Sequence, residues 1–163
     1  MRLTVQVKKE QLIASLVDVR RQILEAASAL PVEKRSQAYL GEWDIFALLA
    51  HLAGWDHTNL QAIEQIQASQ VPGFYQYIGR DWREYNAYLV ATYRLDDLDA
   101  LVDSVRSAQQ ELLARVVELP PVELYRDRDI RFRGYKITVA RLLEAELKDE
   151  RVHLAQLEAF AAG

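Results

Sequence analysis

Four long segments of this 163-residue chain repeat apolar residues every three to four positions. That spacing places the apolar side chains of a segment on one side of an α-helix, so each segment predicts an amphipathic helix. The first covers residues 8–30, and the second begins at Asp44 and continues to residue 68. The third covers residues 98–119, and the last begins near Thr138. Helices of this kind bury their apolar faces against one another, which predicts an all-α four-helix bundle.

The segments between these helices contain prolines and glycines that end helices or turn the chain. The Pro-Gly pair in residues 70–81 predicts an irregular connection, and a shorter helix is expected over residues 82–93. Weak alternation in residues 122–137 favours an extended loop or a small hairpin. Because these links are short and no repeat is present, we expect a single domain over residues 1–163.

The composition is that of a globular domain, since 50% of the residues are hydrophobic and 27% are charged. A net charge of −4 and a pI near 5.4 argue against a nucleic-acid groove, which needs clustered Lys and Arg. We therefore expect a small-molecule substrate and no nucleic acid. The chain has no cysteine, no apolar core of a signal peptide and no stretch long enough to span a membrane. A cytoplasmic protein without a membrane partner is expected.

Two histidines lie beside the apolar faces of the second and last predicted helices. His51 is on the second helix, whereas His153 shares a face of the last helix with Glu146 and Glu150. Asp149 precedes His153 by four residues, so these two side chains also share a face. Imidazole nitrogens and carboxylate oxygens are good ligands for Zn²⁺, Ni²⁺, Fe²⁺ or Mn²⁺. The pattern predicts a divalent-metal site, and the alternative is that both histidines form hydrogen bonds within the packed core.

Other polar and aromatic groups give less specific signals. His57 is expected on the solvated side of the second helix, and the alternating charges of residues 126–131 predict a solvated loop. Trp43, Trp55 and Trp82 are expected in the core or at its rim. The sequence contains no Gly-rich phosphate loop and no G-x-S-x-G motif, which argues against phosphate-loop and nucleophile-elbow chemistry.

The start of the second helix resembles a motif of the DinB-like superfamily of four-helix bundles. In that family the segment W-[STD]-x-x-x-x-x-x-H-L-x-x-W opens the second helix, and its residues correspond here to Trp43, Asp44, His51 and Trp55. The resemblance covers nearly the whole chain, and it implies that His51 is a metal ligand.

The last helix resembles the family pattern H-x-x-x-H-x-x-Q with one departure. His153 and Gln156 match the second His and the Gln, whereas Asp149 replaces the first His. Asp149 can bind a divalent metal through oxygen, or Glu150 can reach the metal instead. The segment of residues 81–90 also resembles the corresponding helix of the ClbS/DfsB-like branch of the superfamily.

The resemblance implies a DinB/YfiT-like bundle with an extra short helix and a long loop before the last helix. It also implies a divalent-metal pocket near one end and, in many members, a homodimer. Members of the family include thiol-dependent S-transferases, maleylpyruvate isomerase-like enzymes and resistance proteins that act on reactive small molecules. We therefore expect a hydrolase or S-transferase whose metal activates water or a low-molecular-weight thiol. The alternative is a non-catalytic small-molecule-binding or dimerising bundle with a degenerate metal site.

The expected metal ligands are His51, Asp149 and His153. Glu150 is expected to act as the general base, a role for which Glu146 is the alternative. Substrate is expected to enter between the connection of the second and third long helices and the loop before the last helix. The aromatic residues predicted to contact it are Trp55, Trp82 and Tyr135, with Tyr75, Tyr77 and Phe132 near the entrance.

Overall fold

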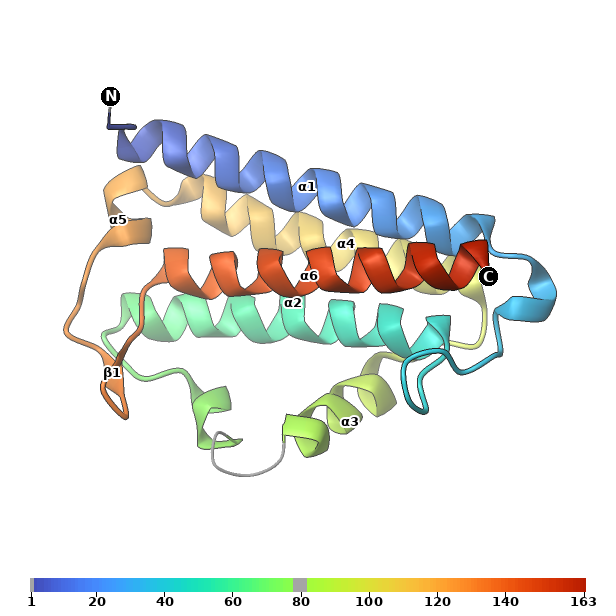
Figure 1. Ribbon diagram of the computed structural model, residues 1–163. Coiled ribbons are helices and arrows are strands. Elements are labelled where there is room, and N and C mark those ends of the chain that lie inside the picture. The colour runs from blue at the N-terminus through green and yellow to red at the C-terminus, as the bar shows by residue number, and fades with distance from the viewer. Residues whose placement is uncertain (1, 78–81) are drawn as a thin grey trace.

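The computed structural model describes residues 2–77 and 82–163. Four long helices lie side by side along most of their length (Figure 1). They are α1 (Val5–Ala29), α2 (Ile45–Gln67), α4 (Leu98–Glu118) and α6 (Val139–Ala162). The expected all-α four-helix bundle is confirmed, and the helix boundaries lie close to those that the apolar spacing predicts.

The directions of the helices explain the long connection in the middle of the chain. Helices α1 and α6 run one way and α2 and α4 run the other way (Figure 1). Because α2 and α4 are parallel, the chain between them must return along the bundle. It does so through the 3-10 helix η2 (Gly73–Tyr77) and the predicted short helix α3 (Trp82–Tyr93), which packs against α2. Of the irregular connection predicted over residues 70–81, residues 78–81 lie outside the described residues.

Each long helix begins with a side chain that accepts a hydrogen bond from the backbone of the first turn. Asp44 caps α2 at 2.9 Å, and Thr138 caps α6 at 3.1 Å, at the positions where the sequence predicts these helices to begin. Thr4 and Asp97 cap α1 and α4 in the same way. These caps satisfy backbone N–H groups that a helix leaves free, and they set where each helix starts.

The connection between α4 and α6 contains the predicted hairpin and one element that was not predicted. Strands β1 (Arg131–Phe132) and β2 (Tyr135–Lys136) pair antiparallel around a two-residue turn. In that turn Arg133 and Gly134 have φ values of 49° and 80°, the left-handed region that glycine adopts most easily. The unpredicted element is the short helix α5 (Pro121–Tyr125). Proline is tolerated at its first position because the backbone N–H groups of the first helical turn have no partner within the helix, so the missing N–H of proline costs no hydrogen bond.

The apolar faces of the four long helices meet in one core. Helix α1 packs mainly on α6, and α2 packs mainly on α3 and α4, whereas α2 and α6 contact each other much less. Within residues 2–77 and 82–163, no helix is long and apolar enough to cross a membrane. The sparse packing between α2 and α6 leaves room for the polar groups described below. Fully buried members of the core include Leu16, Ile23, Leu48, Ile63, Leu101, Leu112 and Leu143.

Candidate metal centre and its pocket

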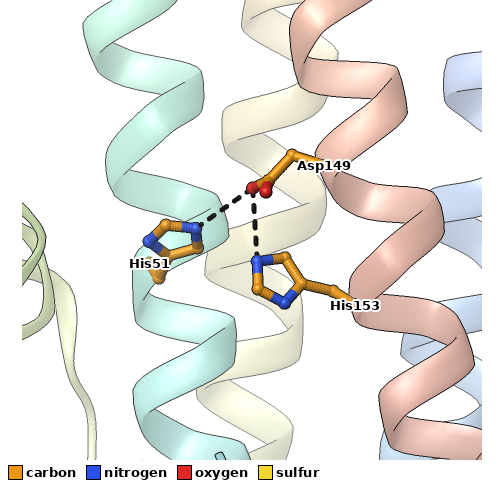
Figure 2. Close-up of side chains that lie close together, drawn as sticks. All are labelled: His51, Asp149 and His153. Carbon is orange, nitrogen blue, oxygen red and sulfur yellow. Dashed lines mark ion pairs between the residues drawn. The ribbon is translucent and has the colours of Figure 1, made fainter.

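The fold brings together the three side chains that the sequence predicts as metal ligands. His51 projects from α2, and Asp149 and His153 project from neighbouring turns of α6 (Figure 2). Asp149 Oδ2 lies 3.6 Å from His51 Nε2 and 3.2 Å from His153 Nε2. Ligand atoms of the three residues all lie within 4.8 Å of one another. Residues about a hundred positions apart in sequence therefore form one compact group.

This group is buried on one side and open on the other. The His51 side chain is only 6% exposed, and the ring centroids of Trp43 and Trp55 lie 4.9 and 6.4 Å from that of its own ring. The side chain of Asp149 is 58% exposed. Solvent therefore reaches the group more easily at Asp149 than at His51.

Hydrogen bonds set the protonation of the group. Burial alone would lower the pKa of His153, but the hydrogen bond to Asp149 and its charge, together with Gln156 and Glu150, outweigh burial and raise that pKa. Gln156 Oε1 lies 3.1 Å from His153 Nδ1, so both ring nitrogens face oxygen acceptors and the ring favours its charged form. Burial lowers the pKa of His51, whereas hydrogen bonds from both imidazoles overcome burial and lower the pKa of Asp149.

The geometry fits a divalent metal ion. Metal–ligand distances of about 2.0–2.2 Å place neighbouring ligand atoms roughly 3–4 Å apart, which agrees with the spacing found around Asp149 Oδ2. Two imidazoles and one carboxylate suit Zn²⁺, Ni²⁺, Fe²⁺ or Mn²⁺. The hydrogen bond at His153 Nδ1 leaves Nε2 to face the site, an arrangement common among metal-binding histidines. Of the two carboxylates weighed as third ligand, Asp149 lies with the histidines and Glu150 does not.

Glu150 instead belongs to a buried ionic cluster, which we define as Arg20, Asp56, Glu146 and Glu150. The guanidinium of Arg20 donates to Glu150 Oε1 through Nε at 2.5 Å and to both oxygens of Asp56 at 2.7 and 3.0 Å. Glu146 Oε1 lies 3.7 Å from Arg20 Nη2. The cation that these interior carboxylates require is therefore the side chain of Arg20 on α1.

The ionic cluster holds more carboxylates than cations, and this affects its protonation. Burial raises the pKa of Glu146 well above its usual value, and the charges of Asp56 and Glu150 raise it further. Burial also raises the pKa of Glu150, although Arg20 opposes this effect. Asn59 donates a hydrogen bond to Glu146 at 2.9 Å. The cluster therefore favours retention of a proton by one of its glutamates.

Sequence reasoning missed Arg20, Asp56 and Asn59, although a signal for them exists. Arg20 stands four residues after a core leucine and three before a core isoleucine, on the buried face of α1. Asp56 and Asn59 interrupt the buried face of α2 in the same way. A charged or amide residue at such a position indicates a buried polar partner on another helix.

A cavity of about 840 Å³ opens beside both groups of polar residues. The predicted substrate-contacting residues Trp55, Trp82 and Tyr135 all line it, between η2 and α3 on one side and the hairpin on the other. Tyr77 is not among the lining residues, and its ring instead packs 4.7 Å from that of Tyr85. Further lining residues are Trp43, Phe74, Tyr75, Phe132, Glu146, Asp149, Glu150 and His153.

Hydrogen bonds fasten α3, which carries one wall of the cavity, to α2. Trp55 Nε1 donates to Asn86 Oδ1 at 2.9 Å, and the hydroxyls of Thr58 and Tyr85 lie 2.6 Å apart. The sequence did not predict Asn86 as a site residue, although it lies in the segment 81–90 that resembles the ClbS/DfsB-like branch. The aromatic wall is thus held in position by polar contacts made through side chains of both helices.

Two other expectations concern residues outside the cavity. His57 is half-buried and stacks on Tyr93 with centroids 4.9 Å apart, so it is less solvated than its position on the helix predicts. Within residues 126–131, Arg131 pairs with Asp127, and both are well exposed. That pair agrees with the solvated loop that the alternating charges predict.

The fold and the site together define an all-helical bundle with a candidate metal pocket. Residues 15–157 match the family model of the DinB superfamily, and the chain belongs to that family. A comparison with curated proteins gives no match.

Two solved structures share the fold. One is the colibactin self-resistance protein ClbS in complex with a dsDNA, with a TM-score of 0.73 and 16% identity over 93% of this chain and 94% of that one. The other is an uncharacterised protein from Escherichia coli UTI89, with a TM-score of 0.73 and 14% identity over 94% of this chain and 92% of that one. At these identities the two similarities show that the fold is shared.

The prediction that nucleic acid is excluded as a partner is wrong. ClbS has this fold and is crystallised with dsDNA. The exclusion depended on the net charge of −4, which is a sum over the whole molecule. Phosphate binding depends on the cations of one local surface, so an acidic total charge does not rule it out.

Proposed function

We propose that the chain is a divalent-metal-dependent enzyme that acts on a reactive small molecule in the cavity between α2 and α6. The observation that carries this proposal is the convergence of His51, Asp149 and His153 at the wall of an aromatic cavity of about 840 Å³. When bound, a divalent cation supplies Lewis-acid chemistry that activates water or a thiol at neutral pH. Hydrolysis and thiol S-transfer are the two reaction types that follow from this chemistry.

The residues around the ligands have separate proposed roles. Gln156 holds the ring of His153 through Nδ1, which keeps Nε2 aimed at the site. Trp55, Trp82 and Tyr135 contact the apolar body of the substrate. Glu150 is the proposed general base, because its side chain lines the cavity and burial raises its pKa toward the range in which a carboxylate accepts protons at neutral pH.

Metal content is the first test of this proposal. We expect protein purified without a metal-affinity step to contain about one divalent ion per chain, or to bind one when Zn²⁺, Ni²⁺, Fe²⁺ or Mn²⁺ is added. His51→Ala and His153→Ala should each abolish this binding and the accompanying rise in melting temperature. His57→Ala is the matched control, because it removes a histidine of the same helix that stacks on Tyr93 outside the site.

Activity is the second test. Metal-loaded protein is assayed for hydrolysis of 4-nitrophenyl acetate and for transfer of glutathione or cysteine to chlorodinitrobenzene. The proposal predicts activity that is lost in both histidine variants and retained in His57→Ala. Absence of metal binding, or metal binding that survives both variants, would refute it. In that case a non-catalytic binding role in the same cavity becomes the better explanation.

Binding of duplex DNA is a second candidate function, favoured by one observation at the mouth of the cavity. Arg133 and Arg141 are exposed there, and their guanidinium groups lie over the rings of Phe132 and Tyr135 at 5.2 and 5.4 Å. The complex of ClbS with dsDNA motivates the test. We expect Arg133→Ala with Arg141→Ala to weaken binding of a labelled duplex, measured by fluorescence anisotropy at several salt concentrations. Arg106→Ala, on the exposed face of α4, is the control.

A further inference from the structure

The ionic cluster next to the cavity lacks positive charge. Asp56, Glu146 and Glu150 provide three carboxylates, whereas Arg20 is the cation that holds them. The side chains of Arg20, Asp56 and Glu150 are no more than 1% exposed, so water screens their charges poorly. A buried excess of carboxylates is stabilised when a further cation or proton joins it.

One buried oxygen of this cluster lacks a hydrogen-bond partner within the described residues. Glu150 Oε1 accepts from Arg20, but Glu150 Oε2 is buried without a hydrogen-bond partner among residues 2–77 and 82–163. Both Glu150 and Glu146 line the cavity. A buried acceptor without a donor costs free energy, which a ligand that supplies an N–H group recovers. The residue that carries the unpartnered oxygen therefore lines the space in which substrate is proposed to bind.

The walls of the cavity favour the same kind of ligand. They include the indole rings of Trp43, Trp55 and Trp82, whose faces attract cations as well as apolar groups. The exposed guanidinium groups of Arg133 and Arg141 lie over aromatic rings of the hairpin, where water screens their charge. The charge of His153, which also lines the cavity, is balanced by Asp149. The interior thus combines an aromatic body with a carboxylate that has one unused oxygen.

We propose that the substrate of this cavity is an apolar, ring-containing molecule that carries an ammonium group. The ammonium donates a hydrogen bond to Glu150 Oε2 and supplies the positive charge that the ionic cluster lacks, while the rings of the cavity contact the apolar part. This inference depends on the proposed function in one respect, which is that the cavity is the substrate site. It adds the chemical class of the substrate.

Two probes of nearly identical size test the charge preference. Binding of 2-naphthylmethylamine, which is cationic at neutral pH, is compared with binding of neutral 2-naphthylmethanol by isothermal titration calorimetry. We expect the amine to bind at least about tenfold more tightly, as for a hydrogen bond that involves two charged groups. Glu150→Gln should reduce this ratio to about one. Glu144→Gln, the same substitution on the exposed side of α6, should leave the ratio unchanged.

A second variant keeps the test decisive if Glu150→Gln does not fold, as judged by circular dichroism. Asp56→Asn removes another carboxylate of the ionic cluster and should also lower the ratio. The proposal is overturned if wild-type protein binds both probes equally. It is also overturned if the ratio is unchanged in whichever of the two variants folds.

The metal content of every sample separates this proposal from the proposed function. The titrations are done on protein as purified and on His51→Ala, and metal is measured in each sample. A preference for the amine that persists in His51→Ala supports the ammonium site even if no metal is ever found. Equal binding of the two probes to a protein that does hold metal rejects the ammonium site and leaves the metal proposal standing.

Discussion

Gly54 in α2 lies directly against Leu89 in α3, so that a methyl group on Gly54 would come within 2.7 Å of Leu89 Cβ. Alanine normally stabilises a helix interior by about 1 kcal/mol relative to glycine. Here the clash should outweigh that gain, and we expect Gly54→Ala to lower the free energy of unfolding by about 1–3 kcal/mol. Urea denaturation measures this change. Faster amide exchange in α3 but not in α1 would show that the loss of stability arises at the contact of α2 with α3. A variant more stable than wild type would show that α3 shifts to accommodate the methyl group without loss of stability, and would contradict the prediction.

Arg20 should be among the least replaceable residues of the chain. Arg20→Met leaves Asp56, Glu146 and Glu150 buried without their cation, and loss of one member of a buried ion pair costs about 3–5 kcal/mol. The loss should shrink as pH falls, because protonation removes the negative charges that Arg20 balances. Urea denaturation at two pH values measures both effects. Arg21→Met, on the exposed side of the same helix, should change stability little, and an equal loss in both variants would contradict the prediction.

The two histidines of the site should titrate on opposite sides of the usual imidazole value of 6.5 in metal-free protein. Burial lowers the pKa of His51, whereas Asp149 raises that of His153 despite burial. The stabilisation of charged His153 is fully present below pH 6.5 and is lost as pH rises through its raised pKa. NMR titration of the imidazole signals measures both values. Asp149→Asn should lower the pKa of His153, and a His153 pKa that does not change would disprove the pairing.

Metal binding should depend on pH through the same group. Imidazoles bind metal in their neutral form, so a metal ion must displace the proton that Asp149 and Gln156 favour on His153. We expect Zn²⁺ affinity to fall as pH drops through the raised pKa of His153, with proton release on binding. Calorimetry in buffers of different ionisation enthalpy detects that proton. Binding that is independent of pH between 6 and 8, roughly the range in which histidine titrates, would contradict the assignment of His153 as a ligand.

Asp44 both caps α2 and pairs with Arg94 of the chain after α3 through two hydrogen bonds of 3.0 and 2.8 Å. Burial raises the pKa of Asp44, but the hydrogen bonds from Arg94 and Ala47 outweigh burial and lower it. The resulting stability is present above the usual value of 3.8 and is lost as pH falls through the lowered pKa. Asp44→Asn keeps a capping side chain, whereas Asp44→Ala should cost about 1 kcal/mol more. Urea denaturation at neutral and acidic pH separates the two contributions.

The helices and the shared face of Asp149 and His153 could be predicted because helical periodicity is a local property of sequence. The sequence could not decide between Asp149 and Glu150 as the third ligand. Side chains of successive helical residues point about 100° apart around the helix axis, and the packing of α6 on α1 sets which of them points to the site. The contact between Arg20 and Glu150 joins residues 130 positions apart. No pattern within one helix identifies such a partner, although a buried charge indicates that a partner exists.

The weak packing between α2 and α6 determines how occupancy of the site should affect unfolding of the protein. The bundle consists of two layers, α1 with α6 and α2 with α3 and α4, and His51 lies in one layer while Asp149 and His153 lie in the other. A ligand held by all three adds a further connection between the layers, beside the buried contacts Arg20–Asp56 and Asn59–Glu146. Unfolding must break this connection, so occupancy of the site should appear chiefly in the rate at which the protein unfolds.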